Sequence, residues 1–315
     1  MDYKKIFKSR ELRFKILSLM DWVPDSIMLR LQYWIQTGRK LNLKNPKRFT
    51  EKMQVYKMKC RNSDMLRCTD KYEVREYVTE KGLGDCLIQL IGVYNKVEDI
   101  NFTTLPNQFV AKTTDGGGGT RVYICKDRDK ASKDEFLGLM DDWMKSPKPK
   151  KHFGREWAYE NNYPRRILIE ELIGNTPVQN SPIGGRGKDC YLNCNQDSLL
   201  DYKIFCFNGE PKLLYISDNE KQELAFLDLE WNVLPFLRRD YHPMEYIPQQ
   251  PANLEQMIAV ARKLAQPFPH VRVDLYNVNG KIYFGELTFY TSSGYINFEP
   301  DNVDFILGNL FNSVW

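Results

Sequence analysis

The chain has 315 residues, a length that suggests about two domains. Of these residues 42% are hydrophobic and 13% are aromatic, enough for a sizeable core, so global disorder is excluded. No run of about 18 apolar residues occurs, and the first ten residues lack the apolar core of a secretory signal. We therefore expect no membrane-spanning helix and a cytoplasmic location. The net charge is +4, but residues 1–61 carry sixteen Lys and Arg against five Asp and Glu. This basic segment predicts contact with something anionic.

The N-terminal region is expected to be helical. Residues 3–23 alternate apolar and basic side chains with a helical period and end before Pro24, and a second helix is expected from Ser26 to Thr37, ending at Gly38. Two interpretations of residues 3–23 remain open. One is peripheral attachment to an anionic membrane, and the other is a helix packed on the body with a solvated basic face. No nucleic-acid-binding motif accompanies the charge, so nucleic acid is not an expected partner.

The remaining elements mix helices and strands. Helices are expected at residues 50–61, 70–80, 132–144 and 254–265, and strands at 86–94, 108–112, 120–125, 166–172, 202–207, 212–216, 271–277 and 281–288. The pairs Asn208-Gly209 and Asn279-Gly280 predict tight hairpin turns. Residues 174–198 form a long polar, glycine-rich stretch. The pattern predicts the α+β class with mostly antiparallel sheets.

The cysteines and histidines offer little chemistry. Seven scattered cysteines in a chain without an export signal are typical of reduced, buried thiols, and Cys190 and Cys194 lack the second pair that a zinc site needs. Histidine occurs only at 152, 242 and 270, and no Ser/His/Asp or Cys/His arrangement can be argued from these positions.

A glycine tract suggests one candidate phosphate site. Lys112 ends an expected strand, and the tract Gly116, Gly117, Gly118 and Gly119 follows it. Glycine N–H groups can close over phosphate oxygens without interference from Cβ atoms, and a strand-borne lysine adds a fixed positive charge. A hairpin tip without a ligand is the alternative.

A second candidate site lies on the last two expected strands. With a side-chain period of two, Arg272 and Asp274 share one face, and so do Glu286 and Thr288. Pairing the strands around Asn279-Gly280 places the two carboxylates side by side, as Mg²⁺ carrying nucleotide phosphates requires. The alternative is a polar strand face in contact with solvent.

Two further polar groups end or begin expected strands. Glu170 and Glu171 close one apolar strand, and Lys203 enters another. Lys203 could reach a phosphate, although both features are also typical of solvated strand ends.

The order of these motifs resembles the ATP-grasp superfamily. The motifs are Asp70-Lys71-Tyr72, Phe109 to Lys112 with its glycine tract, Ile167 to Glu171, Arg272-Val273-Asp274 and Glu286-Leu287-Thr288. The segments 201–209 and 271–289 resemble the TupA-like ATP-grasp group, which is associated with bacterial surface-polysaccharide and teichuronopeptide gene clusters. The resemblance covers residues 45 to 311. It implies two α+β lobes that sandwich a nucleotide: a basic helical segment 1–65, a first lobe 66–170 and a second lobe 171–315.

The resemblance also implies roles for individual residues. Lys71 and Lys112 would contact the phosphates of ATP, with Gly116 to Gly119 as a lid. Glu170 would meet the adenine amino group, and Glu171 and the backbone near Leu172 and Ile173 would complete the adenine site. Lys203 would approach the phosphates from the second lobe, and Arg272 would steady the transferred phosphoryl group. Asp274 and Glu286, with Thr288, would hold one or two Mg²⁺ ions.

This chain departs from the family pattern at three places. Thr288 stands where many ATP-grasp ligases have an asparagine, and no acidic residue follows Glu171 within a dozen positions to bind the ribose. The basic segment replaces the usual α/β N-terminal domain. Arg186 and Lys188, in the polar stretch, are candidates for binding an acidic substrate.

The implied activity is an ATP- and Mg²⁺-dependent carboxylate–amine ligase. Its expected substrates are a carboxylated sugar or glycan, such as a uronic acid of a surface polysaccharide, and a small amine such as an amino acid. The alternatives are a kinase on the same scaffold that phosphorylates a glycan hydroxyl, and a non-catalytic module that binds acidic glycan or lipid.

Overall fold

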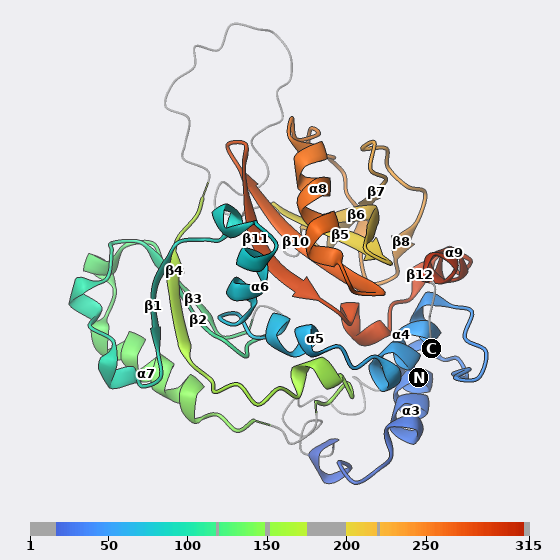
Figure 1. Ribbon diagram of the computed structural model, residues 1–315, viewed down its shortest axis with the longest axis horizontal. Coiled ribbons are helices and arrows are strands. Elements are labelled where there is room, and N and C mark those ends of the chain that lie inside the picture. The colour runs from blue at the N-terminus through green and yellow to red at the C-terminus, as the bar shows by residue number, and fades with distance from the viewer. Residues whose placement is uncertain (1–16, 118–119, 149–151, 175–199, 219–220, 312–315) are drawn as a thin grey trace, which may run out of the picture.

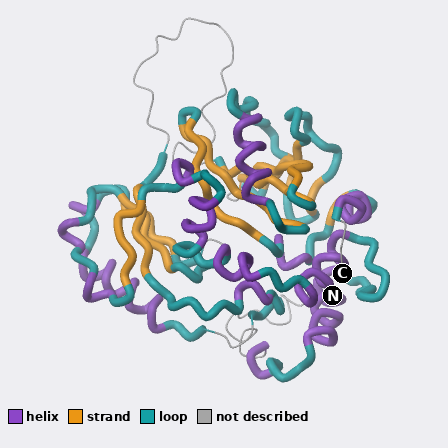
Figure 2. The backbone as a smooth tube through the Cα atoms, in the orientation of Figure 1, coloured by secondary structure: helices purple, strands orange, loops and turns teal. Residues whose placement is uncertain are grey.

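The computed structural model describes residues 17–117, 120–148, 152–174, 200–218 and 221–311, and it confirms an α+β chain with mostly antiparallel sheets. Its helices are α3 (Asp25–Thr37), α4 (Phe49–Lys59), α5 (Ser63–Cys68), α6 (Val74–Glu80), α7 (Lys133–Lys145), α8 (Leu254–Ala265) and α9 (Val303–Leu310). The two main sheets form separate lobes, with α5 and α6 between them in the view of Figures 1 and 2.

The first lobe is a four-stranded antiparallel sheet in the order β1-β4-β2-β3. These strands are β1 (Leu90–Tyr94), β2 (Phe109–Thr113), β3 (Val122–Cys125) and β4 (Ile167–Glu171). Alternate residues of β2 and β4, including Phe109 and Ile169, pack with Phe136 and Met140 of α7. The intervening residues, among them Lys112, therefore lie on the other face, which is turned away from α7.

The second lobe is a six-stranded sheet in the order β11-β10-β5-β6-β7-β9, in which only β7 and β9 pair in parallel. Its strands are β5 (Asp201–Phe207), β6 (Glu210–Asp218), β7 (Glu223–Leu227), β9 (His242–Pro243), β10 (His270–Val278) and β11 (Lys281–Thr288). Both expected hairpin turns are confirmed: Asn208, Gly209, Asn279 and Gly280 all have positive φ, as two-residue turns of this kind require. Helix α8 packs against β10, β5 and β6.

The sheet face that carries Arg272 is covered by aromatic residues at one end. His270 of β10 and Phe207 of β5 have ring centroids 4.7 Å apart, and Phe49 of α4 lies 5.2 Å from His270. Phe311, after α9, lies 5.3 Å from the same histidine. The N-terminal helix α4 is thus built into the core of the second lobe, and its packing fixes where β10 lies.

The N-terminal helices match the expectation in part. Helix α3 ends at Gly38, whose φ of 71° and N–H bond to the carbonyl oxygen of Trp34 form a left-handed cap. Residues 3–16 of the expected basic helix lie outside the described residues. Residues 17–19 are helical, but residues 20–22 form a turn, so the helix ends before the expected residue 23. None of the described helices has the length and hydrophobicity needed to cross a bilayer.

Several elements were not expected from the sequence. These are α5, β7, β9, α9 and the two-stranded pair β8 (Leu237–Arg238) and β12 (Phe298–Glu299). The strand expected at residues 86–94 begins only at Leu90, because Gly84–Cys86 form a 3-10 turn.

Candidate functional site

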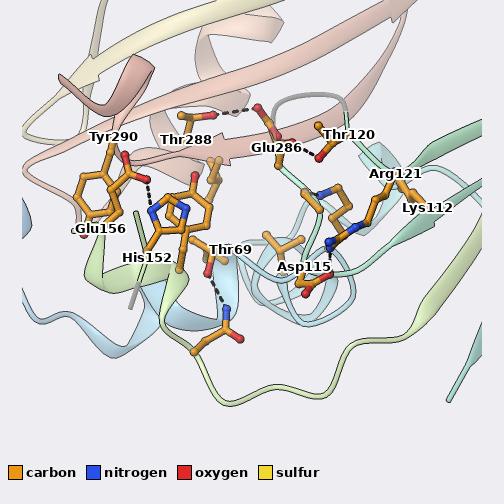
Figure 3. Close-up of a pocket in the computed structure, with 18 of the residues that line it drawn as sticks. Thr69, Lys112, Asp115, Thr120, Arg121, His152, Glu156, Glu286, Thr288 and Tyr290 are labelled. Carbon is orange, nitrogen blue, oxygen red and sulfur yellow. Dashed lines mark hydrogen bonds and ion pairs between the residues drawn. The ribbon is translucent and has the colours of Figure 1, made fainter. Parts of the chain in front are cut away.

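A cavity of about 960 Å³ lies between the two lobes and is lined by residues from both sheets. In Figure 3, Lys112, Asp115 and Arg121 lie toward one end, and His152 and Glu156 toward the other. Glu286 and Thr288 of β11 lie between these groups. Of the expected site residues that the structure describes, Lys71, Lys112, Gly116, Gly117, Glu170, Arg272, Glu286 and Thr288 line this cavity.

The strands β10 and β11 bring the four polar residues together in the expected register. Arg272 is opposite Thr288, and Asp274 is opposite Glu286. The guanidinium group of Arg272 donates to both carboxylate oxygens of Asp274 over 2.6 Å each, and to Glu286 over 3.2 Å. On the neighbouring strand, Nζ of Lys203 donates to Asp274 over 3.0 Å. The residues therefore form one ionic cluster, with two cations around Asp274.

The two carboxylates differ in exposure. The side chain of Asp274 is 2% exposed, whereas that of Glu286 is 47% exposed. The hydroxyl group of Thr288 accepts from Arg272 and donates to Glu286, both over 3.0 Å. Both carboxylate oxygens of Asp274 are thus engaged in internal ion pairs, whereas the carboxylate of Glu286 is accessible from the cavity.

Burial and charge set the protonation of this cluster. Burial would raise the pKa of Asp274, but Arg272 and Lys203 outweigh it and hold that pKa below its usual value. Burial likewise opposes the charge of Lys203, but Asp274 outweighs it and raises the pKa of Lys203 above its usual value. Asp201 also contacts Lys203, and burial together with the Asp274 charge raises the pKa of Asp201 to about 6. Arg272, Lys203 and Asp274 are therefore all charged at neutral pH.

The donor set fits Mg²⁺ held jointly with a phosphate ligand. Among the described residues, no group of three or more His, Cys, Asp or Glu side chains is arranged to hold a metal ion by itself. Mg²⁺, however, is usually held by one or two carboxylates together with substrate phosphates and water. Glu286 supplies an accessible carboxylate and Thr288 a neighbouring hydroxyl. Asp274 and Lys203, the other expected members of the site, are held in the ion pairs behind Arg272 and do not line the cavity in the described part of the chain.

Lys71 connects the glycine loop to the centre of the cavity. Asp70 accepts the N–H groups of Tyr72 and Glu73, which fixes the turn before α6, and the N–H of Lys71 donates to the carbonyl oxygen of Thr114 over 2.9 Å. The Lys71 side chain donates to the carbonyl oxygen of Gly116. Burial lowers the pKa of Lys71, and the nearby Glu286 charge opposes this.

Gly116 occupies a position where a side chain does not fit. A Cβ atom there would lie 2.9 Å from the carbonyl oxygen of Thr120 and from the hydroxyl of Thr113, whereas a Cβ at Gly117 would meet nothing within 4 Å. Gly118 and Gly119 lie outside the described residues. The described half of the tract therefore contains one constrained glycine and one unconstrained glycine.

Glu170 makes contacts that its expected role did not include. Its two carboxylate oxygens bind Arg75 over 2.9 Å and Lys112 over 2.6 Å, and its side chain is buried. The expected phosphate ligand Lys112 and the expected adenine ligand Glu170 are thus paired with each other in this structure. Glu171, Leu172 and Ile173 do not line the cavity, as far as the described part of the chain shows.

The other end of the cavity holds residues that sequence reasoning missed. Nδ1 of His152 lies 2.7 Å from Glu156, and Ser293, from the segment after β11, donates to Glu156. Ser293 is 137 residues from Glu156 along the chain, so no local spacing predicts the contact. Cys190, Cys194, Arg186 and Lys188 lie outside the described residues.

A model of the TupA-like ATPgrasp family matches residues 51–312, and the chain belongs to this family. The membership confirms the ATP-grasp fold. ATP-grasp enzymes use ATP and Mg²⁺, which confirms the two expected cofactors. None of the curated proteins compared with the sequence matches it.

Several solved ligase structures resemble the chain distantly. The D-alanine–D-alanine ligase of Helicobacter pylori is 16% identical, with 78% of this chain and 61% of that chain covered, at a TM-score of 0.43. The corresponding ligase of Bacillus anthracis is 16% identical, with 70% and 57% covered, at a TM-score of 0.39. N5-carboxyaminoimidazole synthetase of Staphylococcus aureus, complexed with ADP, is 13% identical, with 79% and 53% covered, at a TM-score of 0.42. The chain spans between half and about three fifths of the length of these ligases.

Proposed function

We propose that the protein is an ATP- and Mg²⁺-dependent ligase that activates a substrate carboxylate and joins it to an amine. Membership of the ATP-grasp family supports this reaction class. The observation that carries the proposal is the ionic cluster, in which Arg272 and Lys203 are fixed by Asp274 while Glu286 remains accessible to the cavity. Phosphoryl transfer needs this kind of positioned charge more than it needs a covalent nucleophile.

We assign each cavity residue a role from its position and charge. Lys71, Lys112 and the backbone of the glycine loop bind the phosphates, since they carry positive charge and N–H groups at one side of the cavity. Glu286 and Thr288, with Asp274, would hold Mg²⁺, which when bound neutralises charge on the phosphate oxygens. Arg272 stabilises the transferred phosphoryl group. The substrate carboxylate attacks the γ-phosphate to give an acyl phosphate, and the amine then displaces phosphate to form the amide.

We assign a uronic acid of a bacterial surface polysaccharide, or its precursor, as the carboxylate, and an amino acid as the amine. The support is the resemblance of residues 201–209 and 271–289 to the TupA-like group and its association with such gene clusters. Because ATP is a cytoplasmic metabolite, the reaction takes place on the cytoplasmic side of the envelope.

Trapping of the acyl phosphate tests the proposal. The protein is incubated with Mg²⁺, ATP, hydroxylamine and either glucuronic or galacturonic acid, and ADP and hydroxamate are measured. Equal release of ADP and hydroxamate supports the ligase. ADP with a stable sugar phosphate would instead show the kinase. Neither product, together with no nucleotide binding, would leave a binding module. Glu286→Gln should abolish both products, whereas Glu299→Gln, a matched change of an exposed glutamate on β12, should not.

A further inference from the structure

The cavity end with His152 carries a pair of side chains that the roles above do not use. Nδ1 of His152 lies 2.7 Å from a carboxylate oxygen of Glu156, and the hydroxyl of Ser293 donates to the other oxygen over 2.6 Å. The side chain of Glu156 is 5% exposed, whereas that of His152 is 34% exposed. The pair therefore presents the imidazole, and not the carboxylate, to the cavity.

Glu156 is held as an anion behind the histidine. Burial would raise its pKa, but His152 and the Lys57 ammonium outweigh burial and lower it. Lys57, itself buried, donates to the carbonyl oxygens of Gly154 and Ser293 over 2.9 and 2.7 Å, which holds this positive charge in place. A carboxylate at this distance keeps the imidazole proton on Nδ1 and leaves the lone pair on Nε2.

The imidazole is also fixed in orientation. Its ring stacks on Tyr159 at a centroid distance of 5.2 Å and an angle of 29°, and its backbone N–H donates to Glu160 over 3.0 Å. The N–H of Gly154 donates to Nδ1 over 3.4 Å, a longer contact than the 2.7 Å to the carboxylate. Of the hydrogen bonds made by the described residues, none engages Nε2.

We propose that His152, positioned by Glu156, is the proton acceptor for the amine in the second step of the reaction. This inference rests on the proposed function. The incoming ammonium group loses two protons as its nitrogen forms the bond to the acyl carbon. One proton goes to Nε2 of His152. The other goes to the phosphate, which leaves as hydrogenphosphate with the electron pair of the broken carbon–oxygen bond. A positioned general base of this kind contributes about 10²- to 10⁴-fold to the rate.

The test separates the two nucleophiles. His152→Asn places an amide nitrogen near the position of Nδ1, so the contact to Glu156 is kept while Nε2 is removed. The assay uses Mg²⁺, ATP, glucuronic acid and either hydroxylamine or a mixture of the common amino acids. Hydroxylamine is uncharged at neutral pH and needs no base to become a nucleophile. His242→Asn, the same change at an exposed histidine of β9, is the control.

In the variant, hydroxamate formation should stay within about threefold of wild type, while amide formation should fall at least about 100-fold. Equal loss of both products would show that His152 only supports the fold or binds the carboxylate, and unchanged amide formation would show that it accepts no proton. Either result overturns the inference. Hydroxamate without any amino-acid amide in wild type would also overturn it, because the site would then take no amine. No hydroxamate in wild type counts against the proposed function, and His152 loses its role with it.

A separate observation concerns the outer face of the N-terminal region. Five large apolar side chains are exposed there: Leu19 (76%), Trp22 (82%), Ile27 (57%), Leu31 (40%) and Trp34 (54%). Ile27, Leu31 and Trp34 follow each other at spacings of four and three residues, so they form one face of α3. Helix α3 lies at the edge of the molecule, away from both sheets (Figure 1). Large exposed apolar side chains gathered on one helix face mark an interaction surface.

The charge around the patch favours an anionic partner. Arg30 is exposed on the same helix face, and Lys40 and Lys44 are exposed just after α3. The acidic Asp25, at the start of α3, forms an ion pair with Arg155 at 3.5 Å. Residues 1–16, directly before the patch, contain six Lys and Arg against two acidic residues. Tryptophan flanked by basic residues is typical of helices that lie in the interface of an anionic bilayer.

Helix α3 and the turn before it are hydrogen-bonded to the segment that carries His152. Gln32 of α3 donates to the carbonyl oxygen of Phe153 over 2.8 Å, and Arg155 donates to the carbonyl oxygen of Met20 over 2.7 Å. Helix α3 therefore directly supports the segment whose residues His152 and Phe153 line the cavity.

We infer that this face of α3 docks on an anionic lipid bilayer and brings the His152 end of the cavity close to it. A substrate carried on a lipid would then reach the cavity from the membrane. This extends the expectation of peripheral attachment from residues 3–23 to the exposed face of α3.

Vesicle sedimentation with the full chain tests the docking. Wild type should bind vesicles of phosphatidylcholine with about 30 mol% phosphatidylglycerol and should bind pure phosphatidylcholine weakly. The variant Ile27→Gln with Trp34→Gln should reduce binding at least about tenfold. The control, Val233→Gln with Ile306→Gln, removes two side chains of similar exposure elsewhere and should bind like wild type. Equal binding of both variants, or a dimer that only the α3 variant dissociates, would overturn the inference.

Discussion

Asp274→Asn should destabilise the free protein far more than Glu286→Gln, although the two residues face each other in the strand register. Asp274 is almost fully buried and neutralises both Arg272 and Lys203. Removing its charge leaves two buried cations next to an amide, and breaking a buried ion pair in this way costs about 3–5 kcal/mol. Glu286 is half exposed, so its ion pair with Arg272 contributes about 1 kcal/mol or less.

The difference is large enough to measure by urea and thermal unfolding. At about 2–4 °C per kcal/mol for a chain of this size, Asp274→Asn should lower Tm by roughly 6–20 °C, and Glu286→Gln by no more than about 4 °C. The m-value in urea should stay unchanged, because neither variant alters the surface exposed on unfolding. Glu299→Gln, an exposed glutamate outside the cavity, serves as the control.

Adding Mg²⁺ and a non-hydrolysable ATP analogue should stabilise wild type much more than Glu286→Gln. A ligand at about 100 times its Kd stabilises wild type by about 2.7 kcal/mol. Glu286→Gln should lose most of this gain, because it removes the accessible carboxylate. If the free energy of unfolding of Asp274→Asn lies within about 1 kcal/mol of wild type without nucleotide, the ion pairs do not stabilise the fold. That result would refute the claim that Asp274 acts on stability and Glu286 on ligand binding.

Two further perturbations address the glycine loop and the aromatic core. Gly116→Ala should weaken binding of the ATP analogue at least about fivefold in calorimetry, because its Cβ meets the backbone of Thr120, whereas Gly117→Ala should bind normally; equal affinities would contradict the steric argument. Burial lowers the pKa of His270 to about 3, while its unfolded value is about 6.5. The unfolded chain therefore takes up the proton first, and the contribution of His270 is complete above about pH 6.5 and is lost as the pH falls, by about 2 kcal/mol at pH 5. His270→Phe should remove this part of the pH dependence of urea unfolding, and an unchanged slope would contradict it.

The strands that carry the cluster could be predicted because local patterns determine them. A period of two fixes which residues share a face, and Asn279-Gly280 fixes the register in which Asp274 meets Glu286. Longer periodic segments such as α8 were likewise predictable, and its bounds agree with the expectation. The two-residue strands β8 and β9 were not, because their pairing depends on partners far away in the chain and not on their own residues.

The chemistry of the site was predictable only in part, for a similar reason. The pattern on β10 and β11 pairs two carboxylates but does not show which of them is buried. That is decided by the third strand, where Lys203 of β5 lies opposite Asp274. The pairing of Glu170 with Lys112 follows from the register of β2 and β4, which the sequence does not specify. The contact of His152 and Glu156 with Ser293 joins two irregular segments, and neither carries a periodic signal.

The placement of the site follows from a single strand face. His270, Arg272 and Asp274 alternate along β10, so they point to the same side of the sheet. At one end this side is closed by Phe49 of α4, which packs against His270. At the other end Arg272 lines the cavity, and Asp274 lies buried beside it in the ion pair. Because the same strand carries both, the aromatic core holds the register on which the ion pairs depend. Helix α4 therefore supports the ionic cluster from outside the cavity, and it belongs to the same packed unit as the sheet that carries the cluster.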